Sequence, residues 1–160
     1  MKTLLLIRHA KAGWGDFGQS DISRTLTERG KEQAHRIAKK ISLEALTPDA
    51  IFSSPAQRTQ QTCEIIASNM GYSMADVIWR DALYLAEADL LFATAQQADD
   101  CMKCIAIIAH NPGLSELANR LLNNPVDGMS PATAIVITWP VQHWQDISMG
   151  TGTLQAYLQP

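Results

Sequence analysis

The sequence has no long hydrophobic run and few cysteines. No apolar stretch approaches the roughly 18 residues that a membrane-spanning helix requires, so we expect no contact with a membrane. The apolar residues after Lys2 stop at Arg8, short of the roughly 7 residues of a signal-peptide core, and we therefore expect a cytoplasmic protein. The 3 cysteines include one C-x-x-C pair but no second pair to complete a zinc site. In a reducing compartment they are expected to be free thiols.

Neither positive nor negative charge is in large excess. The formal net charge of −3 shows no basic footprint of a nucleic-acid-binding protein, although a local basic pocket is compatible with that total. With 9 glycines, 7 prolines and 46% hydrophobic residues, a disordered or fibrous chain is excluded. The length of 160 residues, without internal repeats or a linker, predicts a single domain over residues 1–160.

Short apolar runs alternate with amphipathic stretches along most of the chain. The apolar runs predict strands at residues 3–7, 50–52, 77–79, 104–109, 134–138 and 153–158. Helical spacing predicts helices after the first, second, third and fourth of these strands, and Thr25 with Glu28 predicts a capping box for the first helix. This order predicts a three-layer α/β/α sandwich with a mainly parallel central sheet, to which the last two strands add an antiparallel edge.

Polar residues follow three of the predicted strands directly or within a few positions. They are Arg8 and His9, then Ser53, Ser54 and Arg58, and finally His110 and Asn111. In an open α/β sheet the carboxyl ends of the strands line the ligand crevice, so these side chains are expected to converge. Two arginines and two histidines in one cleft repel one another unless an anion lies between them, and guanidinium groups match phosphate oxygens. The sequence therefore predicts a site for a phosphoryl group.

Three motifs at these positions carry a resemblance to a known family. They are LIRHA at residues 6–10, SSPxxRTxxT at residues 53–62 and HNPG at residues 110–113. Together they resemble the histidine phosphatase superfamily, whose fold is phosphoglycerate mutase-like. The RHAK sequence at residues 8–11, LTERG at residues 26–30 and the short length are most similar to the SixA-like phosphohistidine phosphatases.

The resemblance implies that His9 is the catalytic nucleophile and forms a phosphohistidine intermediate, with Arg8, Arg58 and His110 holding the phosphoryl oxygens. The chemistry agrees, because imidazole with a pKa near ~6.5 is largely neutral at pH 7 and also leaves readily from phosphorus. Fixed cations supply most of the catalysis of phosphoryl transfer. No metal or other cofactor is expected, since no clustered carboxylates offer a magnesium site.

Four further residues are weaker candidates. Lys11, Ser53 and Asn111 are candidate phosphate-binding residues, although Lys11 is equally interpreted as a solvated loop lysine and Ser53 as part of ordinary helix-start chemistry. Larger members of the superfamily place a glutamate general acid after the third strand, where this sequence has Glu87. The alternative is that Glu87 only stabilises the start of the next helix. If no residue acts as general acid, an imidazole leaving group is favoured over an alkoxide, because it needs less help from a proton donor. The substrate expected is then phosphohistidine rather than a sugar phosphate.

Three functions follow, in order of support. The first is a metal-independent phosphatase whose substrate is a His-phosphorylated signalling or phosphotransfer domain. The second is a phosphatase for small phosphoesters with Glu87 as the acid, and the third is an inactive phosphate-binding or phosphoprotein-binding module.

Residues 12–24 are predicted to form a loop that borders the pocket. In this loop, Trp14 and Phe17 either contact a partner protein or pack on the domain.

Overall fold

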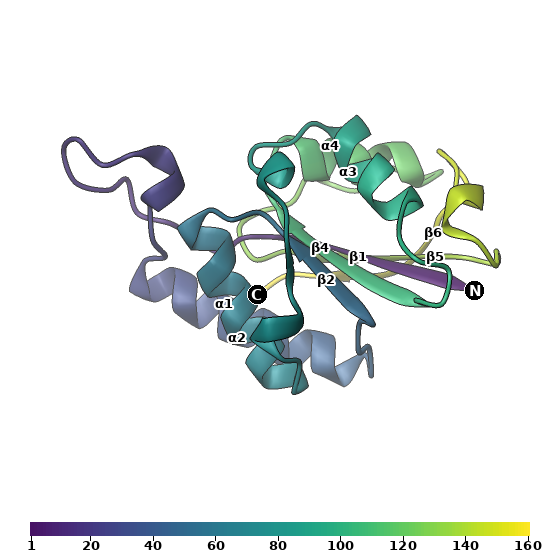
Figure 1. Ribbon diagram of the computed structural model, residues 1–160, viewed down its shortest axis with the longest axis horizontal. Helices are drawn as coiled ribbons and strands as arrows, with labels where there is room; N and C mark the ends of the chain where they lie inside the picture. Colours follow the sequence, from purple (N-terminus) through teal and green to yellow (C-terminus); the bar gives the residue numbers. More distant parts are fainter.

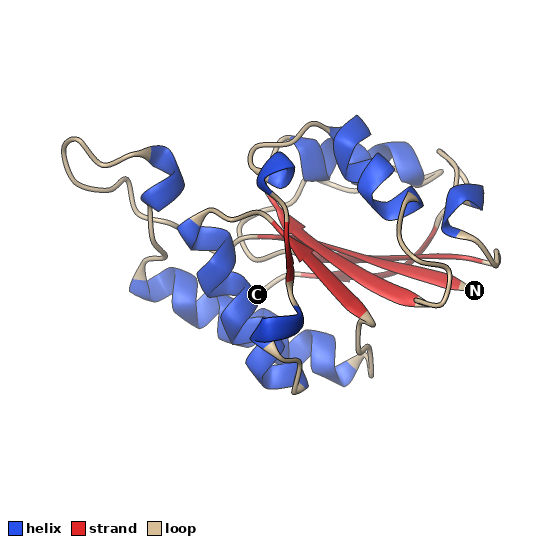
Figure 2. Cartoon of the chain, in the orientation of Figure 1, coloured by secondary structure: helices blue, strands red, loops and turns tan.

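A computed structural model describes residues 1–160 as one six-stranded sheet with helices on both faces. Figures 1 and 2 show α1 and α2 on one side of the sheet and α3 and α4 on the other. The strands are β1 (Lys2–Arg8), β2 (Ala50–Ser53), β3 (Ile78–Trp79), β4 (Cys104–Ala109), β5 (Ala134–Trp139) and β6 (Thr153–Leu158). The helices are α1 (Glu28–Leu43), α2 (Gln57–Met70), α3 (Ala88–Gln96) and α4 (Gly113–Leu121). The predicted α/β sandwich is confirmed.

The sheet has the strand order β3-β2-β4-β1-β5-β6, with β4 and β1 at its centre. The first four strands of that order pair in parallel, so their carboxyl ends meet at one edge. The predicted antiparallel pairing of the two closing strands is also confirmed: β5 pairs antiparallel with both β1 and β6. Because the chain reverses twice, β5 alone runs against the other five strands.

The apolar residues of β1 explain its central place. The side chains at residues 4–7 are fully buried, which is the pattern of a strand covered on both faces. Successive side chains point to opposite faces. Leu4 and Leu6 accordingly belong to the core under α3 and α4, whereas Leu5 and Ile7 belong to the core with α1 and α2.

No helix is both long enough and apolar enough to cross a membrane.

The start of α1 differs from the predicted capping box of Thr25 and Glu28. The N-cap residue is Thr27, whose Oγ1 accepts the N–H of Gly30 at 3.0 Å, and Glu28 is the first helical residue. The chain stays extended before Thr27 because Leu26 is buried and donates its N–H to Gln61 Oε1 at 2.7 Å. Tertiary packing of Leu26 therefore moves the start of the helix two residues along the chain.

Candidate active site

Three of the four strongest candidates lie next to one another at the carboxyl edge of the sheet. β1 and β4 pair in parallel with Arg8 opposite Ala109, so His9 and His110 follow at neighbouring positions. Their ring centroids are 5.2 Å apart. Arg58, in the first turn of α2, points its Nε at His9 Nε2 over 3.3 Å. The convergence predicted from the strand ends is thus present in the structure.

The ring of His9 is held in one tautomer. Its Nδ1 lies 2.7 Å from the carbonyl oxygen of Ala10 and donates to it, which leaves the lone pair on Nε2. Burial, together with the positive charges of Arg58 and Arg8, lowers the pKa of His9 to about 4, although the hydrogen bond to Ala10 opposes this shift. His9 is therefore neutral at pH 7, and the free lone pair of its ring is on Nε2.

Thr62 of α2 fixes the backbone beside this ring. Its Oγ1 accepts the N–H of Ala10 at 3.0 Å and donates to the carbonyl oxygen of Arg58 at 2.7 Å. One buried hydroxyl thereby joins the segment that carries His9 to the helix that carries Arg58. This contact gives the threonine at the last position of the motif at residues 53–62 a structural role in the site.

His110 is only 2% exposed, and its ring has one hydrogen-bond partner. Its Nε2 lies 2.8 Å from Ser54 Oγ, which already accepts the N–H of Ala56 at 3.3 Å. Ser54 is fully buried, and Nε2 is the one acceptor within reach of its hydroxyl hydrogen, so the hydroxyl donates to Nε2. The proton of the neutral ring then lies on Nδ1, a buried atom without a partner. Burial, with smaller effects from the charges of His9 and Arg58, lowers the pKa of His110 to about 3. His110 is a neutral hydrogen-bond donor.

Arg8 is oriented by the backbone of the segment before β5. Its Nη1 donates to the carbonyl oxygen of Met129 at 2.7 Å, while its Nε is buried and has no partner. Burial lowers the pKa of Arg8 from its ordinary value. Asn111 donates to the same carbonyl at 2.9 Å, and its Oδ1 accepts from Ser115 Oγ at 2.9 Å. The structure thus places Asn111 in the network that supports Arg8.

The remaining weaker candidates do not join this cluster. Ser53 is fully buried in β2 and donates to the carbonyl oxygen of Ser54 at 3.1 Å. Lys11 has an exposed side chain. Glu87 lies directly before α3 and lines a surface cavity with Glu116 and Arg120, a cavity that none of the four strongest candidates lines.

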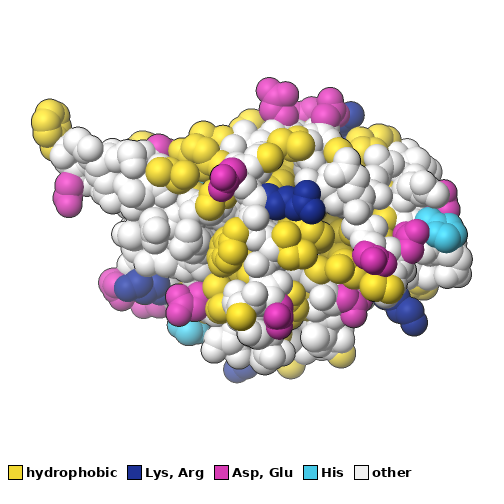
Figure 3. Space-filling model, in the orientation of Figure 1, with side chains coloured by type: hydrophobic (Ala, Val, Ile, Leu, Met, Phe, Trp, Pro, Cys, Tyr) yellow, Lys and Arg dark blue, Asp and Glu magenta, His cyan; other side chains and the backbone are white.

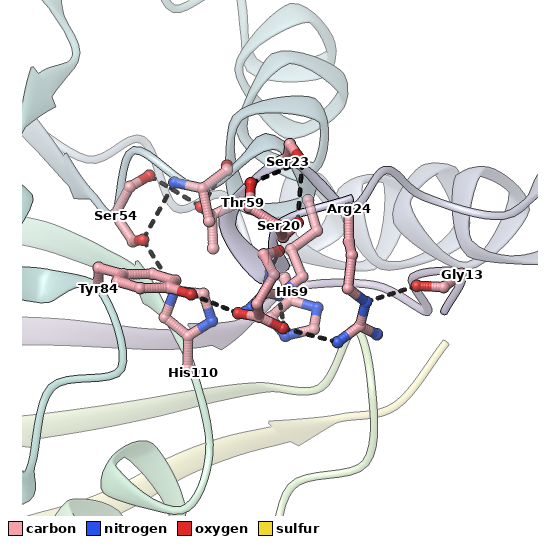
Figure 4. Close-up of polar contacts among 12 residues, drawn as sticks. His9, Gly13, Ser20, Ser23, Arg24, Ser54, Thr59, Tyr84 and His110 are labelled. Atoms are coloured by element: carbon pink, nitrogen blue, oxygen red, sulfur yellow. Dashed lines mark hydrogen bonds and ion pairs between the residues drawn. The ribbon is translucent and has the colours of Figure 1, made fainter. Parts of the chain in front are cut away.

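Residues that the sequence did not single out complete the site. The Asp21 carboxylate, in the short 3-10 helix Asp21–Ser23, accepts from Arg58 Nη2 at 3.0 Å, from Arg24 Nη1 at 2.9 Å and from the Tyr84 hydroxyl. In Figure 4, dashed lines lead from Arg24 and from Tyr84 to this carboxylate. Arg24 also donates from Nε to the carbonyl oxygen of Gly13 at 2.6 Å. Residues 12–24 show no apolar periodicity, so no sequence signal placed Asp21 and Arg24 here.

The donor set of the site suits an anion. Three guanidinium groups and the N–H of a neutral imidazole are grouped around His9, and such groups bind phosphate oxygens. No group of three or more His, Cys, Asp or Glu side chains lies close enough together to hold a metal ion.

Solved structures of similar fold cover nearly the whole chain. A protein from Agrobacterium tumefaciens, assigned as a phosphohistidine phosphatase SixA, has a TM-score of 0.81 at 25% identity, covering 99% of this chain and 98% of that one. A SixA assigned in Nakamurella multipartitia has a TM-score of 0.82 at 25% identity, covering 99% of this chain and 96% of that one. The fold is therefore SixA-like.

Curated relatives match over shorter stretches. Phosphoserine phosphatase 1 of Hydrogenobacter thermophilus is 44% identical over 69 residues, which are 42% of this chain and 32% of that protein. The chain spans less than two thirds of the length of the curated relatives it matches. The sequence model of the histidine phosphatase superfamily (branch 1) matches residues 4–90, more than half of the chain. With the motifs, the SixA-like fold and the geometry around His9, this match shows that the chain belongs to the histidine phosphatase superfamily.

Proposed function

We propose that residues 1–160 form one catalytic domain that removes the phosphoryl group from phosphohistidine on another protein, through a phosphohistidine intermediate on His9. The observation that carries the proposal is the state of the His9 ring. Its Nδ1 hydrogen is bound by the Ala10 carbonyl, its pKa is lowered to about 4, and its Nε2 faces the guanidinium of Arg58. A neutral imidazole with one nitrogen presented to a cationic site is a ready nucleophile for phosphorus.

The reaction has two displacements. In the first, the Nε2 lone pair of His9 forms a bond to phosphorus and the bond from phosphorus to the substrate imidazole breaks. The substrate ring departs neutral once its other nitrogen carries a proton, which a pKa near ~6.5 provides without a dedicated acid. In the second, water attacks phosphorus, the bond to His9 breaks, and inorganic phosphate leaves while the water proton passes to solvent.

Transition-state charge develops on the three equatorial oxygens of the phosphoryl group. Arg58 Nε, the buried Nε of Arg8 and Nδ1–H of His110 are the donors available to these oxygens. The latter two atoms have no partner within the protein, although unpaired buried polar atoms are rare. A phosphoryl group would supply the missing acceptors.

The position of Glu87 supports phosphohistidine as the substrate class. Glu87 lines a separate surface cavity between the starts of α3 and α4. The carboxyl group beside Arg58 is that of Asp21, whose pKa is held well below its ordinary value by hydrogen bonds from Tyr84, Arg24 and Arg58, so it does not supply the proton that an alkoxide leaving group needs. The SixA-like fold supports a phosphohistidine substrate. The similarity to phosphoserine phosphatase 1 favours the second candidate, small phosphoesters with Glu87 as general acid.

A comparison of substrates tests the proposal. The protein is incubated with a His-phosphorylated phosphotransfer domain, with phosphoserine and with a chromogenic aryl phosphate. We expect the phosphohistidine domain to have the highest kcat/KM and an acid-labile label to appear on His9. His9→Ala should abolish both, whereas His35→Ala, an exposed histidine of α1, should not. Turnover that persists in His9→Ala would overturn the mechanism, and loss of aryl phosphatase activity in Arg58→Ala would exclude a passive binding module.

A second pair of variants separates the two substrate classes. Glu87→Gln should leave phosphohistidine turnover unchanged, as should Glu116→Gln on the opposite wall of the same cavity. A fall of about 10²-fold in phosphoester turnover that is specific to Glu87→Gln would establish the second candidate instead.

A further inference from the structure

One carboxylate inside the protein is bound by the groups that surround the nucleophile. Asp21 accepts hydrogen bonds from two guanidinium groups and one phenol, those of Arg58, Arg24 and Tyr84. Arg58 also donates from Nη1 to the Asp21 carbonyl oxygen at 2.8 Å. The hydrogen bond from Tyr84 and those from the arginines hold the pKa of Asp21 well below its ordinary value. Asp21 is therefore a permanent anion in this position.

This anion lies one guanidinium group away from the nucleophile. Arg58 binds Asp21 through Nη1 and Nη2 and His9 Nε2 through Nε. All five N–H bonds of a guanidinium lie in one plane, and the same fork binds carboxylate and phosphate. A bond from His9 Nε2 to phosphorus would release Arg58 Nε for a phosphoryl oxygen. The neighbouring Nη1 and Nη2, which could bind further phosphoryl oxygens, are the donors that Asp21 now occupies.

The Tyr84 ring covers His110 in the same arrangement. It packs edge-on against the His110 ring with centroids 5.6 Å apart, and His110 Nδ1 is buried without a partner. Access of a phosphoryl group to His110 Nδ1 therefore requires a movement of Tyr84, whose hydroxyl donates to Asp21.

The segment that carries Asp21 is built for such a movement. Residues 12–24 project from the body of the protein (Figures 1 and 3). None of the residues of Asp21–Ser23 is buried, and Gly15 and Gly18 have positive φ angles of 78° and 83°. Withdrawal of Asp21 exposes little apolar surface, so its free-energy cost is set by the hydrogen bonds that break, and an incoming phosphoryl group can replace these at Arg58, Arg24 and Tyr84.

We propose that Asp21 is an internal substitute for the substrate's phosphoryl group, and that Arg24 and Tyr84 become phosphoryl-binding residues when Asp21 withdraws. The inference rests on the proposed function, since it takes the His9 site as the phosphoryl site. Arg24 lies at the base of the loop, where its Nε donates to the Gly13 carbonyl oxygen and the Gly13 N–H donates to the Thr25 carbonyl oxygen at 2.9 Å. A movement of Asp21–Ser23 that leaves this base in place therefore leaves Arg24 at the site. Substrate and Asp21 then compete for the same three donors.

Binding of orthovanadate and inorganic phosphate, measured by calorimetry, tests this competition. In Asp21→Asn and Asp21→Ala the dissociation constant should fall by about tenfold, because a competing anion worth one charged hydrogen bond has been removed. Asp16→Asn, which removes the same charge from an exposed position of the same loop, should leave it unchanged. In the Asp21→Ala background, Arg24→Ala and Tyr84→Phe should each weaken binding again.

Equal or weaker binding in the Asp21 variants would overturn the inference, and so would undetectable binding in all of them. Equal binding would show that Asp21 never competes, and weaker binding would show that it orients Arg58 for the ligand. The proposed function has a separate readout, the acid-labile label on His9. A label with no change in affinity refutes the inference alone, whereas tighter anion binding without any label refutes the function alone.

Discussion

His9, the proposed nucleophile, should remain neutral and able to attack phosphorus at a pH where an ordinary histidine is protonated. Burial in the folded protein lowers the pKa of His9 from 6.5 to about 4. At pH 5.5 an unperturbed imidazole would be about 10% neutral, whereas His9 would be about 97% neutral. The rate of His9 phosphorylation should therefore stay nearly constant from pH 7.5 down to about 5, and fall about tenfold per pH unit below about 4.

Two measurements test this profile. The pH dependence of kcat/KM reports the ionisations of the free enzyme and the free substrate, so the titration of the substrate is measured separately and divided out. Nuclear magnetic resonance of ring-labelled histidine follows the imidazoles directly, with His9→Ala and His110→Ala used to assign the signals. A corrected activity loss with its midpoint between pH 6 and 6.5, accompanied by titration of the His9 ring in that range, would refute the reasoning.

The same shift affects folding stability. Because the pKa of His9 is lower in the folded than in the unfolded state, the unfolded chain binds more protons between pH 6.5 and about 4. His9 therefore has no linkage effect above pH 6.5, and below it the stability falls with falling pH until about pH 4. Over this range the free energy of unfolding changes by about 1.4 kcal/mol per pH unit for one such group. Urea unfolding should show a shallower pH dependence in His9→Ala over this window.

Two further predictions concern the supports of the site. Ser54→Ala should lower phosphoryl transfer by about tenfold, because His110 Nε2 loses the donor that fixes its tautomer, while Ser53→Ala at the neighbouring buried position should change the rate little. Gly113→Ala should destabilise the protein by about 1–3 kcal/mol, since a Cβ there would overlap a backbone carbonyl of the segment before α3. Gly128→Ala, which has room for its Cβ, is the control. Thermal unfolding measures both variants, and an equal loss of stability in the two would contradict the prediction.

Much of the site could be predicted because it lies at strand ends. Apolar runs place β1 and β4, and the rule that carboxyl ends line the crevice then brings together His9, Arg58 and His110. Ser53 shows where this reasoning has limited precision. β2 extends one residue further than the apolar run indicates, so Ser53 belongs to the buried strand and Ser54 is the residue that contacts His110.

The ring of groups around Asp21 could not be predicted in the same way. Its contact with Tyr84 joins two irregular segments far apart in the sequence, and neither segment has a periodicity that fixes its conformation. Loops are placed by the surface on which they lie, so their contacts follow from the whole fold and not from local sequence. The capping box at Thr25 is wrong for a related reason, because burial of Leu26 outweighs the local signal.

The adjacency of β1 and β4 has a consequence for how activity is acquired during refolding. These strands pair directly in the middle of the sheet although most of the chain lies between them, and His9 and His110 become neighbours only through that pairing. Closing such a long loop is slow compared with helix formation. On dilution from denaturant, helical circular dichroism should therefore recover before phosphoryl transfer does, so the return of catalysis reports the moment at which the two halves of the chain join.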